Sequence, residues 1–194
     1  MGVTEGGRVR GLVLTPGASA SRDQSALVAI DRAVSADGIA VSRVDFPYRL
    51  AGRKAPDKPP VLVETVVTAA KALAEQAGAA QDRVALGGRS MGGRICSMAV
   101  AEGLPAAALV LVSYPLHPPG KPDILRTGHF PAIGVPCLFV SGTRDAFGTP
   151  DELEVAVAAI PSEVTMVLVE GGDHGLRRKD AQVAATVRDW LSEV

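Results

Sequence analysis

The most informative stretch of this sequence is Val84-Ala85-Leu86-Gly87-Gly88-Arg89-Ser90-Met91-Gly92-Gly93-Arg94. Its leading apolar residues indicate a short buried strand, its glycines indicate a turn, and a helical pattern follows the last of them. One serine lies at the centre of the turn, in the pattern Gly88-x-Ser90-x-Gly92. This spacing matches the Gly-x-Ser-x-Gly signature of a nucleophile elbow.

The signature has a physical reason. A serine that points out of a sharp turn between a strand and a helix takes a strained backbone conformation, often with positive φ. The turn closes only when the residues two before and two after the serine carry no bulk. The helix then directs free N–H groups at the serine, where they stabilise negative charge. An ordinary glycine turn after a strand would show the same pattern. The interpretation of Ser90 as a nucleophile therefore depends on other residues of the chain.

The composition is that of a globular protein. The chain has 194 residues, of which 47% are hydrophobic and 21% charged, and we expect a single domain over residues 1–194. The net charge is −1 and no polybasic run occurs, which argues against nucleic acid or an anionic membrane as the main partner. Cys96 and Cys137 are expected to be buried free thiols rather than a disulfide.

Nothing in the sequence predicts a membrane anchor. No apolar run approaches the length of a membrane span. The N-terminal segment MGVTEGGRVRG contains no apolar signal region, and Gly6 stands where the myristoylation pattern requires Ser or Thr. We therefore expect a cytoplasmic protein.

Apolar segments alternate with amphipathic ones along the chain. Strands are expected at 9–15, 39–46, 83–87, 107–113, 136–141 and 164–169, and helices at about 24–36, 61–77, from the elbow to about 102, 150–160 and 178–192. Polar, proline-rich loops are expected at 47–60 and 115–134, and Asp23 is expected to cap the first helix. The strands are near-continuous apolar runs, so the alternation predicts an α/β fold with a parallel sheet between two layers of helices.

Three reactive residues follow strands of this predicted sheet. Ser90 follows the third strand, Asp145 the fifth and His174 the sixth. Ligands bind such sheets beyond the carboxyl ends of the strands, so these residues are expected at one edge. A serine hydroxyl needs a base to take its proton, and histidine suits that role near neutral pH. A carboxylate fixes the imidazole tautomer and stabilises the imidazolium.

Other residues compete for the role of the acid. Asp151 and Glu152 follow Thr149-Pro150, and capping of the next helix explains them. Asp173 is a rival because it precedes His174 directly, but adjacent side chains rarely point toward each other. Asp145 has no such structural explanation and is the preferred acid.

Two more histidines compete for the role of the base. His117 and His129 lie in the predicted loop after the fourth strand. A single histidine in a loop is usually solvated, whereas His174 lies among glycines at a strand end. These three histidines and the two cysteines are too scattered for a metal site, and no phosphate-binding loop occurs, so we expect no metal and no cofactor.

An acyl-transfer site also needs N–H donors for an oxyanion. The elbow helix offers the N–H of Met91, the residue after the nucleophile. The second donor normally comes from the loop after the first core strand, which is Pro16-Gly17-Ala18 here. Proline has no N–H, so Ala18 is the first candidate and Gly17 the second.

Several further residues are candidates for lining the site. Aromatic residues lie near strand ends at Phe46, Tyr48, Tyr114 and Phe147. Arg89 and Arg94 are candidates for binding an anionic substrate group, although ion pairs with surface acids would explain them equally well. The basic residues of the loop 47–60 form either a solvated face or a small flap over the active edge; they are Arg49, Arg53, Lys54 and Lys58.

Over nearly its whole length the chain resembles the α/β-hydrolase superfamily, and within it small dienelactone-hydrolase-like members without a lid. It is similar more narrowly to the family that includes a testis-expressed hydrolase-like protein and the third subunit of the NSL histone-acetyltransferase complex. Three segments carry this narrower resemblance: Gly87-Gly88-Arg89-Ser90-Met91-Gly92, Ser113-Tyr114-Pro115-Leu116-His117-Pro118-Pro119-Gly120-Lys121-Pro122 and Ser141-Gly142-Thr143-Arg144-Asp145.

The resemblance implies a three-layer α/β-hydrolase fold with about six parallel strands and no cap domain. It also implies a catalytic triad of Ser90, Asp145 and His174. Superfamily members often have His-Gly after the first core strand, and Pro16 replaces that histidine here. Because about eight residues precede the first strand, the antiparallel N-terminal strands of larger members are not expected.

Two functions are compatible with these features. The first is a serine hydrolase acting on a small-molecule carboxylic ester or thioester, with an open, shallow site. The second is an interaction module whose triad is unused and whose proline-rich segment 115–122 is a docking surface. An intact triad favours the enzyme, because a scaffold has no physical need for three such residues.

Overall fold

The computed structural model describes residues 9–194, so the expectations about the N-terminal signal region and Gly6 lie outside the described residues. Six strands form one sheet in which every neighbouring pair is parallel, in the order β2-β1-β3-β4-β5-β6. They are β1 (Gly11–Thr15), β2 (Ala40–Arg43), β3 (Val84–Arg89), β4 (Leu109–Val112), β5 (Cys137–Gly142) and β6 (Val164–Val169). The predicted α/β fold with six parallel strands is confirmed.

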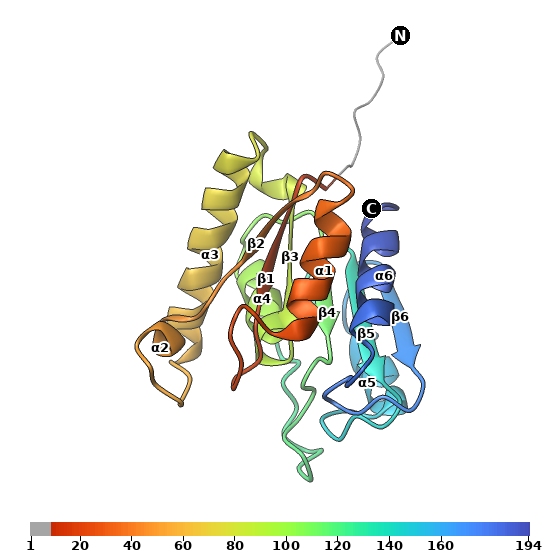
Figure 1. Ribbon diagram of the computed structural model, residues 1–194. Coiled ribbons are helices and arrows are strands. Elements are labelled where there is room, and N and C mark those ends of the chain that lie inside the picture. The colour runs from red at the N-terminus through yellow and green to blue at the C-terminus, as the bar shows by residue number, and fades with distance from the viewer. Residues whose placement is uncertain (1–8) are drawn as a thin grey trace.

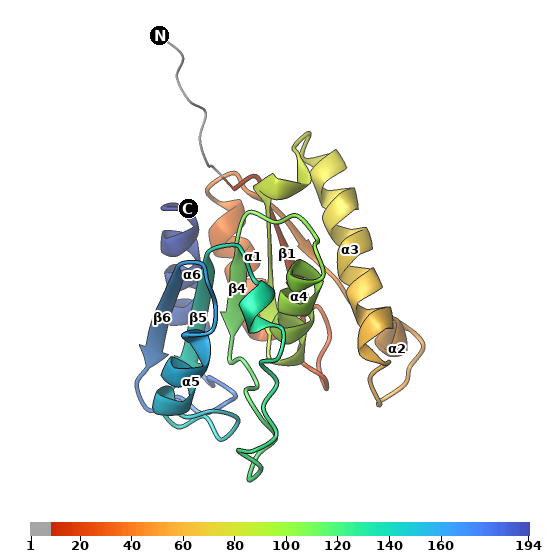
Figure 2. The same cartoon turned by 180° about the vertical axis from the view of Figure 1, so that it is seen from behind.

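Helices cover both faces of the sheet (Figures 1 and 2). They are α1 (Ser25–Ser35), α2 (Pro47–Leu50), α3 (Pro59–Gln76), α4 (Met91–Ala101), α5 (Pro150–Val157) and α6 (Asp180–Leu191), with 3₁₀ turns η1 (Gln81–Arg83) and η2 (Phe130–Ala132). α1 and α6 pack on one face, and α3, α4 and α5 pack on the other. The result is three layers, as expected.

Two apolar clusters form the core, one on each face of the sheet. Consecutive strand residues contribute to opposite clusters: Leu12 packs toward α1 and α6, and Val13 packs toward α3 and α4. Both side chains are fully buried. Successive strand side chains point to opposite faces, and here both faces are covered, which explains why the strands are continuous apolar runs in the sequence.

Three local predictions were wrong. Asp23 does not cap α1, because the helix begins at Ser25 with Gln24 at the N-cap, and the Asp23 carboxylate instead pairs with Arg43 at 2.8 Å. The predicted loop 47–60 contains α2 and the start of α3, whose prolines fit a first helical turn because that turn needs no N–H donor. The loop 115–134 likewise contains η2.

The sheet order determines where a site can form. The chain passes from β1 outward to β2 and then returns to β3 on the other side of β1, so the topological switch point lies between β1 and β3. Thr15 pairs with Gly88 in the last position of that register. The loop after β1 and the elbow after β3 therefore leave the sheet next to each other at its carboxyl edge.

The described residues contain no helix long and apolar enough to cross a membrane. Between β4 and β5 the chain forms only a loop and η2, so no cap domain is inserted there. Cys96 and Cys137 are both buried with free thiols, as predicted. Burial raises the pKa of each thiol to about 12, which makes both poor nucleophiles at neutral pH.

Candidate active site

The turn between β3 and α4 has the strained geometry that the sequence predicts. Ser90 has φ 52° and ψ −119°, a conformation that costs a non-glycine residue about 1–3 kcal/mol. A β-carbon on Gly88 or Gly92 would overlap the backbone oxygen of Thr15. Only glycine at these two positions lets the elbow pack against the end of β1.

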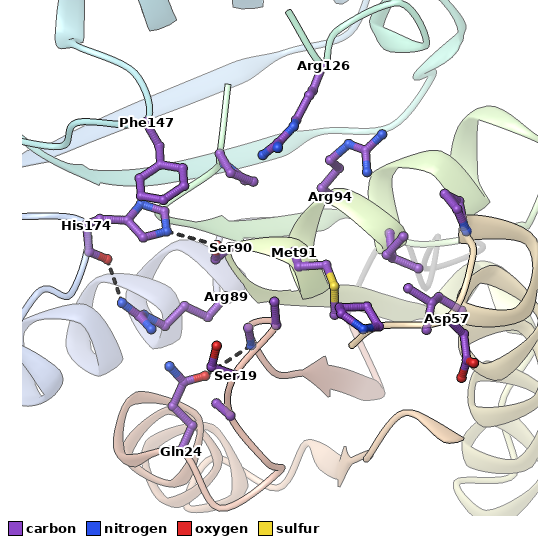
Figure 3. Close-up of a pocket in the computed structure, with 18 residues that line it drawn as sticks. Ser19, Gln24, Asp57, Arg89, Ser90, Met91, Arg94, Arg126, Phe147 and His174 are labelled. Carbon is purple, nitrogen blue, oxygen red and sulfur yellow. Dashed lines mark hydrogen bonds between the residues drawn. The ribbon is translucent and has the colours of Figure 1, made fainter. Parts of the chain in front are cut away.

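The structure brings Ser90, His174 and Asp145 into a continuous series of hydrogen bonds. The Ser90 Oγ lies 2.9 Å from His174 Nε2, and His174 Nδ1 lies 2.9 Å from both carboxylate oxygens of Asp145. We call this series the Ser–His–Asp array (Figure 3 shows the Ser90–His174 contact). The three residues come from the loops after β3, β5 and β6, as the order of strand ends predicts.

Asp145 is a buried carboxylate, and both of its oxygens have hydrogen-bond partners. Its side chain is only 1% exposed. Besides His174, the backbone N–H of Phe147 donates to Oδ1 at 2.8 Å. A buried charge is tolerated only when such partners replace water.

The loops after β5 and β6 are locked together by backbone contacts. The N–H of Arg144 donates to the Gly172 carbonyl at 2.8 Å, and the N–H of Gly171 donates to the Thr143 hydroxyl at 2.9 Å. A β-carbon on Gly142 would overlap the Gly172 carbonyl, so glycine is required for this close approach. The contact places the loop of Asp145 beside the loop of His174.

Two further side chains fix the position of His174. The ring of Phe147 stacks on the imidazole, with centroids 3.9 Å apart and an interplanar angle of 25°. The Arg89 guanidinium donates to the His174 carbonyl at 2.5 Å (Figure 3). Burial lowers the pKa of Arg89, and the negative charge of Asp145 opposes that effect. Arg89 therefore links the elbow to the loop of His174.

The competing acids have other surroundings. Thr149 and Glu152 form a complete capping box at the start of α5, as the sequence predicts. Asp173 is exposed, and its carboxylate makes no hydrogen bond to the imidazole of His174 among the described residues. The carboxylate that reaches this imidazole belongs to Asp145 alone in the described part of the chain.

The prediction that His117 and His129 are solvated was wrong. His117 is only 5% exposed, and its Nε2 lies 3.4 Å from Glu152. His129 is partly buried, with its Nε2 2.7 Å from the Oγ of Ser97. This second serine–histidine contact differs from the Ser–His–Asp array, because Ser97 is fully buried and no described carboxylate bonds to His129.

His129 makes stability depend on pH. Burial, aided by the charge of Arg94, lowers its pKa to about 4, whereas an unfolded histidine titrates near 6.5. Between about pH 6.5 and pH 4 the unfolded chain therefore binds more protons, and the free energy of unfolding falls as the pH falls. Urea midpoints from pH 7.5 to 4.5 should drop less for His129→Gln than for the unaltered protein. Equal slopes for the two proteins would contradict the assignment.

A cavity of about 640 Å³ lies beside the array at the carboxyl edge of the sheet (Figure 3). This volume is typical of small-molecule pockets, which span roughly 300–1,000 Å³. Eight of the residues singled out in the sequence line it: Gly17, Ala18, Arg89, Ser90, Met91, Arg94, Phe147 and His174.

Three aromatic residues expected to line the site do not. Phe46, Tyr48 and Tyr114 are buried in the core, at 0%, 0% and 2% exposure. The hydroxyl groups of the two tyrosines bond to the backbone of residues that line the cavity. The Tyr48 hydroxyl donates to the Ala18 carbonyl at 2.5 Å, and the Tyr114 hydroxyl donates to the Arg126 carbonyl at 2.7 Å. The sequence places an aromatic residue near a strand end, but packing decides which way it points.

The loop after β1 contributes N–H groups at the cavity. The N–H of Gly17 donates to the Gln24 side chain at 3.3 Å, whereas those of Ala18 and Met91 have no acceptor in the described part of the chain. Pro16, which has no N–H, is buried. Of the two candidate donors in this loop, Ala18 is the one whose N–H is not engaged by another described group.

Two parts of the cavity lining were not settled by the sequence. The role of the loop 47–60 was undecided, and one arginine was not identified. Pro56, Asp57 and Pro59 border the cavity, while Arg53, Lys54 and Lys58 are exposed, so the loop 47–60 is both a cavity wall and a solvated basic face. Arg126, from the loop after β4, was missed. Its position beyond a strand end was the only available signal, and it shares that position with about twenty loop residues.

No group of three or more His, Cys, Asp or Glu side chains that could hold a metal ion occurs within residues 9–194. The cavity and the array beside it present a hydroxyl, an imidazole, carboxylates, arginines and backbone N–H groups.

A doubly wound parallel sheet with a serine elbow after its third strand, and with aspartate and histidine after later strands, defines the α/β-hydrolase fold. The chain belongs to the family described as Alpha/beta hydrolase domain, which matches residues 8–193.

Solved structures have the same fold at low sequence identity. A dienelactone hydrolase from Anabaena variabilis has 20% identity and a TM-score of 0.74, with 97% of this chain and 88% of that chain covered. An alpha-beta serine hydrolase homologue from Coxiella burnetii has 18% identity and a TM-score of 0.71 over 97% and 86% of the two chains. An esterase domain from Rhodothermus marinus has 17% identity and a TM-score of 0.71 over 98% and 89%. At these identities the likeness concerns the fold alone.

Proposed function

We propose that this protein is a serine hydrolase that cleaves a carboxylic ester or thioester of a small molecule. The observation that carries the proposal is the Ser–His–Asp array, in which both contacts measure 2.9 Å. A nucleophile, a base within hydrogen-bond reach and a third group that orients the base are the components that this chemistry requires. The array opens onto a cavity large enough for a small molecule.

The geometry supports a two-step reaction. The Ser90 Oγ attacks the acyl carbon while His174 Nε2 accepts the serine proton. The carbonyl π bond becomes an oxyanion, which re-forms the double bond as the alcohol or thiol departs with the proton from His174. Water then attacks the acyl-enzyme, His174 accepts a proton from it, and the carboxylic acid leaves as the proton returns to Ser90. Asp145 stays ionised and orients the imidazole throughout.

The N–H groups of Met91 and Ala18 are the proposed oxyanion donors. Met91 is the first residue of α4, so its N–H lies in the free first turn beside Ser90. Removal of one such donor typically raises the barrier by about 2.7–4 kcal/mol. Tyr48 contributes indirectly, because its bond to the Ala18 carbonyl fixes the loop.

A fluorophosphonate probe tests the proposal directly. The probe phosphonylates a serine only when a base activates the hydroxyl, so we expect one adduct, mapped to Ser90 by mass spectrometry. His174→Ala should lose the adduct, whereas His129→Ala should keep it. A folded sample that takes up no probe between pH 6 and 9, or that is labelled at another serine, would overturn the proposal.

The alternative function, an interaction module with an unused array, has less support. Residues 115–117 of its proposed docking segment are buried, and only 119–122 are exposed. Membership of the narrower family with the testis-expressed protein and the NSL subunit rests on the three segments quoted above and remains part of this proposal, as does the cytoplasmic location. Both the narrower family and the docking function predict that the protein binds a partner protein. The labelling experiment measures the reactivity of Ser90 and needs no partner, so its result does not depend on this prediction.

A further inference from the structure

Two arginines line the cavity without any anionic partner. Arg94 lies on α4, one turn after Ser90, and Arg126 lies in the loop between β4 and η2. Neither guanidinium makes a hydrogen bond or an ion pair with the described residues, and the Nε of Arg94 is buried with no partner at all. Figure 3 shows the two side chains next to each other on one side of the cavity.

No neighbouring group among the described residues neutralises the positive charges of Arg94 and Arg126. Burial and the charge of Arg94 both lower the pKa of Arg126, and no carboxylate acts in the opposite direction. The neighbouring His129 is neutral at physiological pH. Asp57 is the one acidic residue among those that line the cavity, but its Oδ1 accepts from Arg53 at 2.7 Å, and it lies away from the pair (Figure 3).

Arg89 differs from this pair although it lines the same cavity. Its guanidinium donates to the His174 carbonyl, and Asp145 lies close enough to favour its charged form. The arginines of the cavity therefore fall into two groups, those with partners in the protein and those without. Arg89 has a structural role, and Arg94 and Arg126 have none in the described contacts.

Two unpaired guanidinium groups in a partly enclosed site are unfavourable unless an anion accompanies them, since each has lost water and repels the other. Guanidinium groups match the oxygens of a carboxylate or phosphate, to which they donate charge-assisted hydrogen bonds. The geometry points to an anion subsite formed by Arg94 and Arg126, so that the substrate is an ester or thioester that carries a carboxylate or phosphate group. This inference rests on the proposed function.

The test compares charged and neutral substrates of equal length. The charged ones are p-nitrophenyl half-esters of glutaric, adipic, pimelic and suberic acids and their phosphonate analogues, and the neutral ones are the corresponding methyl esters. 4-Acetoxybenzoate and its methyl ester test an anion on the alcohol side. We expect kcat/KM to be higher for the charged member of at least one pair, after subtraction of spontaneous hydrolysis.

Arg94→Gln and Arg126→Gln should each reduce that charged-to-neutral ratio by about 10- to 100-fold, which corresponds to loss of one or two charge-assisted hydrogen bonds. Lysine at either position should restore part of the ratio, because the charge returns without the planar fork. Arg32→Gln, an exposed arginine of α1 that is not part of the cavity, is the matched control and should keep the ratio. Thermal midpoints show whether each variant is folded, and if one fails to fold, the other decides.

A binding measurement separates this inference from the proposed function. Calorimetry with Ser90→Ala and the free dicarboxylates or phosphonates requires no hydrolysis, and binding should weaken in the Arg94→Gln and Arg126→Gln backgrounds. Hydrolysis of neutral esters with no charged preference, and no anion binding to Ser90→Ala, would overturn the subsite alone. Anion binding without any Ser90-dependent hydrolysis would overturn the proposed function and leave the subsite standing.

Discussion

Replacement of Ser90 by alanine should reduce kcat for ester hydrolysis by about 10⁴- to 10⁶-fold. The Oγ is the atom that forms the acyl-enzyme, and no other described serine lies beside a histidine that also contacts a carboxylate. The substitution removes one partly buried oxygen from the turn and adds no bulk, so the fold should be retained. Steady-state kinetics with a neutral p-nitrophenyl ester measure the effect, and circular dichroism verifies the fold.

The control for this variant is Ser97→Ala. Ser97 contacts His129 at 2.7 Å but is fully buried, so its loss should leave most of the activity. The double variant Ser90→Ala with His174→Ala should be hardly less active than either single variant, because the two residues act as a unit. Independent, additive losses would mean that His174 does not act through Ser90, which contradicts the mechanism.

Asp145→Asn should lower kcat by about 10⁴-fold while the protein remains folded. Asparagine fills the same space and can still accept from the N–H of Phe147. Its amide nitrogen donates rather than accepts, so it favours the imidazole tautomer with hydrogen on Nε2, which cannot take the proton of Ser90.

Asp173→Asn is the matched control, because it changes the other acid beside His174. Asp173 is exposed and makes no hydrogen bond to the imidazole among the described residues, so this variant should keep kcat within a few-fold. A large loss in Asp173→Asn together with a small loss in Asp145→Asn would exchange the two roles and refute the array as described.

The fold was predictable because its signal is strong and local. Runs such as Leu109–Val112 are buried on both faces of the sheet, so they are continuously apolar and easy to recognise. Boundaries were less certain. Asp23 looked like a helix cap, yet α1 begins too late for it, and its carboxylate instead contacts Arg43 from a separate strand. The local sequence does not show whether a carboxylate caps the adjacent helix or pairs with a distant arginine.

The positions of Ser90, Asp145 and His174 were also predictable, because parallel strands all end at the same edge and reactive residues directly follow three of them. The lining of the cavity was not. Tyr48 and Phe147 both follow strands and are both aromatic, yet one is buried behind the Ala18 loop and the other stacks on His174. The direction of a side chain depends on which neighbour it packs against.

The sequence by itself determined the layered α/β architecture, the elbow at Ser90 and the order of the three reactive residues, since periodicity, glycine spacing and strand ends are properties of the chain alone. Only the tertiary structure decided that Asp145 rather than Asp173 reaches His174, that Arg89 has a bonding partner, and that Arg94 and Arg126 have none. Each of these depends on which groups from distant segments meet across a few ångströms, and a linear pattern does not specify those distances.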